Sequence, residues 1–171
     1  MLFRSAGGVS PAVFAEVGSW RARALALLRS NGLARAEAEA ESAEVVRALQ
    51  AVLQDSTGRW VLGARAGAKT ETSWSGWATT ERGEVVRTLR GDRIFRGGAV
   101  PCSVEETHLW IVDYKTARHG ASGLDAFLES EKGKYVHQLE AYAEIMRKVQ
   151  GESLPIRMAL YYPLLTRLVW W

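Results

Sequence analysis

Cysteine and long hydrophobic runs are what this sequence of 171 residues has least of. Cysteine occurs once, as Cys102, which excludes an internal disulfide framework, a zinc site with several cysteine ligands and a cysteine-ligated iron–sulfur cluster. No apolar run approaches the roughly 18 residues of a membrane-spanning helix, and no signal-peptide pattern opens the chain. These absences predict a protein of the reducing cytoplasm.

The composition that remains is that of a globular protein. Hydrophobic residues make up 47% and charged residues 24% of the chain, which excludes the disordered and fibrous classes. The length predicts a single domain, with a helical part over residues 1–58 and a sheet core over residues 59–171. The formal net charge of +3 leans toward an anionic partner.

Hydrophobic periodicity predicts the order of helices and strands. Apolar positions recur with helical spacing in residues 11–28, 34–54, 124–131 and 134–149, and with strand spacing in residues 70–77, 85–95, 109–116, 156–162 and 168–171. Turn-forming residues at 55–58 precede a short packing segment, 59–62. The first three strands follow one another through turns, which predicts an antiparallel meander. The whole order indicates an α/β or α+β protein with one mixed sheet flanked by helices.

The segment 109–116 combines the pattern of a buried strand with two charged side chains. Asp113 and Lys115 lie two residues apart and therefore project from the same face of a strand, together with Ile111. A buried carboxylate or ammonium needs a partner or a metal ion. From this strand alone, an edge strand with a surface ion pair and an active site are equally good interpretations.

Three motifs follow one another along the chain: Gly91-Asp92-Arg93, then Asp113-Tyr114-Lys115-Thr116, then Gln138-x-x-x-Tyr142. In order and spacing they resemble the RecB-like nuclease domain of the PD-(D/E)XK superfamily, and more narrowly the C-terminal nuclease domain of bacterial helicase-nucleases of the AddA and RecB type. The match spans about residues 69–171. It implies a PD-(D/E)XK nuclease-like mixed sheet and a bacterial nuclease, an exonuclease acting on DNA in double-strand break repair or recombination.

The resemblance implies a site for a divalent cation. Asp92 and Asp113 would be metal ligands, the backbone carbonyl of Tyr114 would add another oxygen, and Glu71 would bind the ion directly or through water. Oxygen ligands select Mg²⁺ or Mn²⁺, which neutralise charge on a phosphodiester and activate water. Lys115 would orient or deprotonate the attacking water and stabilise the developing charge.

The resemblance also implies that the chain contacts DNA, either single strands or duplex ends. Gln138 and Tyr142 would lie beside the site, where they contact DNA or support the lysine. Arg90 and Arg93 belong to a basic stretch suited to phosphates. The arginines of that stretch are Arg82, Arg87, Arg90, Arg93 and Arg96.

Each residue of the site also has an ordinary structural interpretation. Asp92 between two arginines is consistent with a surface ion pair. Glu81 or Glu84 could replace Glu71 if the strand register differs. Tyr142 lies on the apolar stripe of its helix and Gln138 could be a plain surface residue.

The chain departs from the family pattern in its histidines. RecB-type nucleases usually carry a histidine on an N-terminal helix, whereas the three histidines here are His108, His119 and His137. The phosphate loop of a helicase, Gly-x-x-x-x-Gly-Lys-Ser/Thr, is also absent from the sequence. Two hypotheses follow: a nuclease that works with a helicase domain or partner subunit, or a catalytically inert nuclease-like module that binds DNA or a partner.

Overall fold

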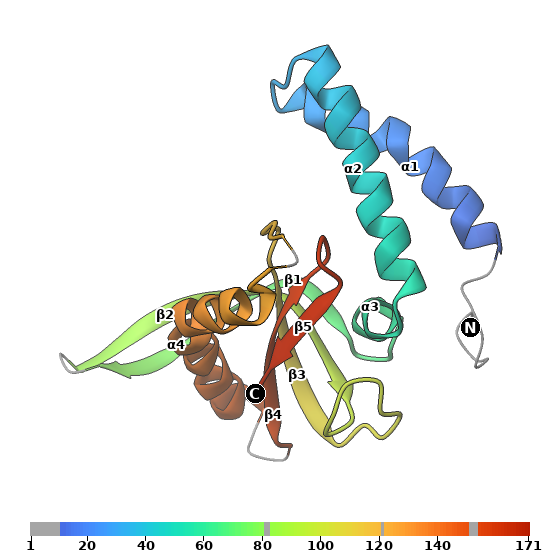
Figure 1. Cartoon of the computed structure of the whole chain (residues 1–171). Coiled ribbons are helices and arrows are strands. Elements are labelled where there is room, and N and C mark those ends of the chain that lie inside the picture. The colour runs from blue at the N-terminus through green and yellow to red at the C-terminus, as the bar shows by residue number, and fades with distance from the viewer. Residues whose placement is uncertain (1–10, 81–82, 121, 151–153) are drawn as a thin grey trace. The chain divides into compact units, whose positions relative to one another are not determined.

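The computed structural model describes residues 11–80, 83–120, 122–150 and 154–171, which form two compact units (Figure 1). The first unit ends at Gly63 and the second begins at Ala64. The sequence-based boundary between a helical part and a sheet core lies five residues earlier, at 58. Within the described residues, no helix is long and apolar enough to cross a membrane.

The first unit consists of three helices. Helix α1 spans Pro11–Ser30, α2 spans Arg35–Gln54 and α3 spans Ser56–Leu62. Proline suits the first turn of a helix because it has no N–H to satisfy there. Gly32, at φ +93°, ends α1 in the left-handed conformation that favours glycine.

Helix α3 corrects the expected turn at 55–58. The carboxylate of Asp55 accepts a hydrogen bond from the backbone N–H of Gly58 at 2.6 Å, which caps α3 at its N-terminus. The predicted turn is therefore wrong: Asp55 caps a helix that begins at Ser56 and continues through the predicted packing segment 59–62. Val61 of α3 and Val52 of α2 are buried in this unit.

The second unit is built on a five-stranded mixed sheet, which confirms the α/β expectation (Figure 1). The strands lie in chain order, and their bounds are β1 Lys69–Thr80, β2 Gly83–Gly97, β3 His108–Tyr114, β4 Ile156–Tyr162 and β5 Arg167–Trp170. Strands β1, β2 and β3 form the predicted antiparallel meander. Strand β4 pairs with β3 in parallel, and β5 returns antiparallel beside β4.

Helix α4, Leu124–Gln150, connects β3 to the parallel strand β4 and packs on one face of the sheet (Figure 1). The sequence predicted two helices separated near residue 132, and that break is wrong. Gly133 lies inside the continuous helix, because a single glycine costs a helix only about 1 kcal/mol. The Glu131 carboxylate also accepts a hydrogen bond from the Lys134 ammonium across this point, at 2.5 Å.

The core of the second unit lies between α4 and the sheet. Ile111, Leu139 and Leu160 are almost completely buried there. The opposite face of β3 carries Trp110, whose ring stacks on Phe95 and whose indole N–H donates to the carbonyl of Gly98 at 2.8 Å. Side chains on both faces of β3 are buried, which leaves its charged end as the exception to explain.

Candidate active site

Asp113 lies at the carboxyl end of β3, on the face that packs against α4. Its neighbours on that face of the strand, Leu109 and Ile111, belong to the core under the helix. The residue is only 8% exposed, although it carries an ionisable group. A carboxylate taken so far out of water requires compensation from its surroundings.

Lys115 provides part of that compensation. Its Nζ lies 2.6 Å from Oδ2 of Asp113, and its side chain is itself largely buried. The predicted shared face of the two side chains is thus present. The ammonium of Lys115 is therefore the ion-pair partner of this oxygen.

The pKa of Asp113 depends on the opposing effects of burial and of the Lys115 charge. Burial raises the pKa of the Asp113 carboxyl above its ordinary value, and the negative charge of Asp92 raises it further. The hydrogen bond and charge of Lys115 act in the opposite direction but do not cancel the effect of burial. The ionised form of Asp113 is therefore disfavoured by burial, and an additional positive charge nearby would stabilise it.

Asp92 reaches the same end of the sheet from β2. Antiparallel pairing of β2 with β3 extends to Arg93 and Val112, so Asp92 follows directly beside Asp113 in the register. Oδ2 of Asp92 accepts a hydrogen bond from the backbone N–H of Tyr114 at 2.7 Å. The structure therefore brings together two carboxylates and the ammonium of Lys115.

Glu71 has a different environment. Its carboxylate forms an ion pair with Arg90 on the neighbouring strand, with one oxygen 2.5 Å from Nη2 and 2.9 Å from Nε. Both side chains are more than half exposed. Glu71 also has φ +50°, an uncommon backbone conformation for a residue other than glycine. Among the described residues, the Glu71 carboxylate thus pairs with Arg90 and not with Lys115.

Glu81 and Glu84 were the two other acidic candidates for the position of Glu71. Glu81 lies outside the described residues, and Glu84 pairs in register with Thr79, far along the hairpin from Asp92. Of the basic stretch, Arg93 is mostly buried and its guanidinium lies over the ring of Phe95, 5.7 Å from its centroid. Arg90 is solvent-exposed and engaged by Glu71.

Tyr114 projects from the opposite face of β3. Its ring meets the edge of Tyr161 at 6.2 Å between centroids, and burial raises the pKa of its phenol to about 12. Only the backbone of Tyr114 is thus placed for the site. Its N–H is already used by Asp92.

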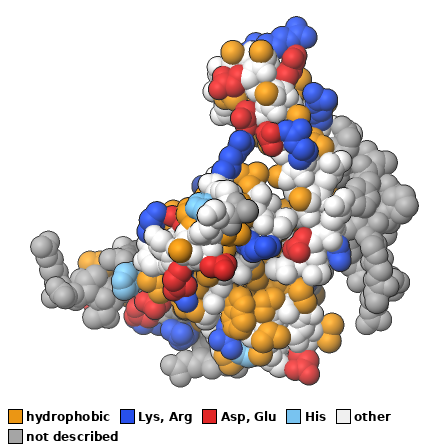
Figure 2. All heavy atoms as spheres, in the orientation of Figure 1, with side chains coloured by type: hydrophobic (Ala, Val, Ile, Leu, Met, Phe, Trp, Pro, Cys, Tyr) orange, Lys and Arg blue, Asp and Glu red, His pale blue; other side chains and the backbone are white. Residues whose placement is uncertain are grey.

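Gln138 and Tyr142 interact with each other on α4. The side-chain amide of Gln138 donates to the hydroxyl of Tyr142 at 2.6 Å, as expected for residues four apart on a helix. Tyr142 packs against the core of the second unit, and Gln138 is exposed. Figure 2 shows both acidic and basic side chains on the exposed surface, and α4 carries residues of both signs.

Tyr135, on α4, contacts the lysine of the site, although the sequence did not predict it as a site residue. The Lys115 ammonium lies 3.6 Å from the centroid of its ring. The available signal was its position on α4, three residues before Gln138 and seven before Tyr142, which places all three on one helix face. What the sequence could not show is that the lysine side chain bends back onto that face.

The histidines lie at several places in the second unit. His119 follows Lys115 in the loop before α4, where its ring stacks on Phe127 at 4.4 Å and its Nδ1 is 2.6 Å from the carbonyl oxygen of Gly120. His137 is exposed on α4 beside Glu140. His108 is at the opposite end of β3 from Asp113, where Nδ1 lies 3.0 Å from the hydroxyl of Thr107.

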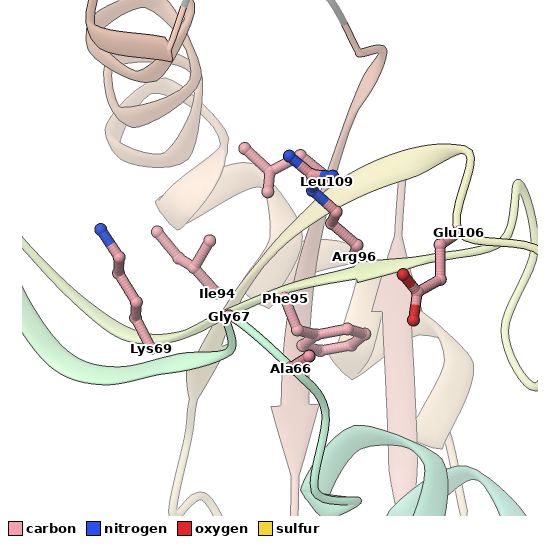
Figure 3. Close-up of a pocket in the computed structure, with 8 residues that line it drawn as sticks. All are labelled: Ala66, Gly67, Lys69, Ile94, Phe95, Arg96, Glu106 and Leu109. Carbon is pink, nitrogen blue, oxygen red and sulfur yellow. The ribbon is translucent and has the colours of Figure 1, made fainter.

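A pocket of about 300 Å³ lies away from the carboxylates (Figure 3). Leu109, at the beginning of β3, lines it, four residues before Asp113. Ile94 of β2, two residues from Asp92, also lines the pocket, but neither Asp92 nor Asp113 does. The pocket lining consists of Ala66, Gly67, Lys69, Ile94, Phe95, Arg96, Glu106 and Leu109.

The donor set suits a hard divalent cation that is only partly enclosed by protein. Within the described residues, no three His, Cys, Asp or Glu side chains gather closely enough to hold an ion by themselves. Asp92 and Asp113 are nevertheless two neighbouring carboxylates, and Asp113 is buried with the single ammonium of Lys115 as its ion-pair partner. Mg²⁺ commonly takes one or two carboxylates and completes its shell with water and substrate phosphate, so these residues fit it.

No known family model matches the chain, and a comparison with curated proteins finds no match either. The resemblance to RecB-like nucleases therefore stays a prediction from the motif residues of the sequence.

Proposed function

We propose that the chain is a Mg²⁺-dependent deoxyribonuclease of the RecB-like, PD-(D/E)XK type, which hydrolyses phosphodiester bonds at DNA ends. The observation that carries this proposal is the buried Asp113 carboxylate, with Asp92 and Lys115 gathered around it at one end of the sheet. Buried charged groups with shifted pKa values concentrate at functional sites. The mixed sheet, with α4 crossing between parallel strands, is compatible with the fold that the resemblance implies.

In this proposal Asp92 and Asp113 would hold the cation, together with the backbone carbonyl of Tyr114. The cation would polarise the phosphate and lower the pKa of water. The water oxygen forms a bond to phosphorus, the bond from phosphorus to the leaving sugar oxygen breaks, and solvent takes the water proton and returns one to the leaving oxygen. Lys115 supplies positive charge where the phosphate becomes more negative.

Substitution of Asp113 tests the proposal directly. Asp113→Asn keeps the shape of the side chain and removes its charge, so we expect cleavage of linear DNA with Mg²⁺ or Mn²⁺ to fall by about 100-fold or more. Asp125→Asn, at the exposed first turn of α4, is the matched control and should retain activity. Circular dichroism is the measurement that checks whether both variants are folded. Equal rates in the wild type and Asp113→Asn would refute the assignment.

A second candidate function is a nuclease-like module that binds DNA or a partner subunit without cleaving it. The observation that favours it is the ion pair of Glu71 with Arg90, which leaves two carboxylates instead of three at the site. Calorimetric titration with Mn²⁺ separates the two functions. Salt-sensitive DNA binding without a heat of metal binding at millimolar Mn²⁺ would support the inert module, whereas metal binding abolished by Asp113→Asn would support the nuclease.

A further inference from the structure

We propose that Tyr135 is a positioning residue that holds the Lys115 ammonium beside Asp113. This inference rests on the proposed function, because it specifies how the lysine of that site is oriented. The ring of Tyr135 would act through its face, as a weak electrostatic partner for the cation, and its hydroxyl would have no part in the effect.

The geometry of the contact is that of a close cation–π pair. Nζ of Lys115 lies 3.6 Å from the ring centroid of Tyr135 and 2.6 Å from Oδ2 of Asp113. Attraction between an ammonium and an aromatic face extends to about 6 Å, so this pair is well inside the favourable range. The lysine side chain is 20% exposed, and an ammonium shielded from water in this way interacts more strongly with the ring.

Tyr135 is itself held in place by the helix and the core. Its ring packs against the hydrophobic core of the second unit, beside Leu139 one turn later on α4. Leu139 is 1% exposed, which anchors this part of the helix on the sheet. The ring is therefore a rigid support for a side chain that is otherwise long and flexible.

The Lys115 ammonium has two contacts, one with the Asp113 carboxylate and one with the Tyr135 ring, and together they restrict it more than either contact alone. Asp113 alone would leave Lys115 free to rotate about its four-carbon stem while keeping one charge contact. The Tyr135 ring limits that rotation, because a cation over the ring face gains attraction that it loses when it swings away. The ammonium is then held beside the Asp113 carboxylate, where the proposed reaction requires positive charge. Positioning of this kind acts on the chemical step more than on substrate binding.

Substitutions at Tyr135 distinguish a ring-face contact from simple packing. Tyr135→Phe keeps the ring and should leave kcat within about twofold of the wild type, whereas Tyr135→Leu keeps apolar bulk and should lower kcat by about three- to tenfold with KM little changed. In a Lys115→Met background, Tyr135→Leu should have no further effect. An equal loss in both backgrounds would show a structural role and overturn the proposal.

A second measurement needs no activity. Protons above an aromatic face are shifted upfield, so we expect the ε-methylene protons of Lys115 to resonate upfield in the wild type and in Tyr135→Phe, and at the ordinary lysine position in Tyr135→Leu. An unchanged resonance in Tyr135→Leu would overturn the contact. If the wild type shows the shift but cleaves no DNA with Mn²⁺, the nuclease assignment fails while the positioning contact stands.

Discussion

At the scale of single residues, the site is defined by one carboxylate that the fold keeps away from water. Several charged groups of the second unit form exposed pairs, such as Glu71 with Arg90 or Glu144 with Lys148, and pairs of this kind contribute little to stability. Asp113 differs because burial, and not a neighbour, dominates its pKa. A buried carboxylate of this kind lowers the free energy of unfolding. A role in a reaction therefore explains its presence better than a contribution to stability does.

The pKa of Asp113 predicts how its removal changes stability with pH. Because the folded protein has the higher pKa, ionisation of Asp113 lowers the free energy of unfolding as the pH rises from the ordinary value of 3.8 through the raised folded value. Asp113→Asn should therefore be at least as stable as the wild type at pH 7, and its advantage should disappear in acid. Urea denaturation at several pH values measures this. The prediction would be contradicted if the stability of Asp113→Asn, measured relative to the wild type, were lower at pH 7 than at pH 3.

At the scale of elements, the sequence predicted most of the sheet and the wrong number of helices over α4. Alternation of apolar residues located all five strands, and short turns gave the antiparallel meander, because these depend on local patterns. The break near residue 132 was wrong because Gly133 was weighed without the tertiary contacts that keep α4 continuous on the sheet. Helix propensity is a weak signal where packing on a core decides the structure.

Gly133 gives a test at this scale. A Cβ built there would meet no atom within 4 Å, and its φ is not in the left-handed region. Gly133→Ala should stabilise the protein by up to about 1 kcal/mol, because alanine has the higher helix propensity. Thermal and urea unfolding measure the change. A lower melting temperature would mean that α4 does not continue through this position.

Gly76 is the matched contrast to Gly133. It lies on β1, where an added Cβ would come within 2.8 Å of Cγ2 of the buried Ile145 on α4. Gly76→Ala should therefore destabilise the protein by about 1 kcal/mol or more, by forcing the strand and the helix apart. The opposite signs of the two glycine substitutions distinguish an open helix surface from a tight helix–sheet contact.

The contacts of the candidate site were predictable from the sequence only where they depend on strand alternation. Strand alternation placed Asp113 and Lys115 on one face, and the structure confirms that placement. It could not show that Glu71 turns to Arg90, since this depends on a local backbone conformation at φ +50°. It also could not show Lys115 against Tyr135, because that contact joins side chains twenty residues apart through the packing of α4. The catalytic roles of these residues stay predictions.

At the scale of the whole molecule, each of the two units has its own buried residues. The second unit contains the complete sheet, α4 and every residue of the proposed site from Glu71 to Tyr142. A unit with its own core can in principle fold alone. The helical unit then contributes no side chain to the chemistry proposed here.

A fragment of residues 64–171 tests this division. We expect it to unfold in a single cooperative transition and to retain Mn²⁺ binding, because its core is formed within the fragment. Near-ultraviolet circular dichroism of the fragment, which contains Trp110 and Trp170, reports whether its aromatic packing persists. A fragment without cooperative unfolding would show that the sheet unit depends on the helices of residues 11–62.

The hydrogen bond from the Tyr114 backbone to Asp92 provides an internal reporter for the site. The amide proton of Tyr114 rests on the carboxylate that would bind a cation, so its chemical shift and exchange rate follow the electron density of that carboxylate. Titration with Mg²⁺ can thus be followed at a backbone atom, without DNA. For the same reason Asp92→Asn is a cleaner probe than Asp92→Ala: asparagine still offers that proton an acceptor, whereas alanine removes a strand-end contact along with the charge.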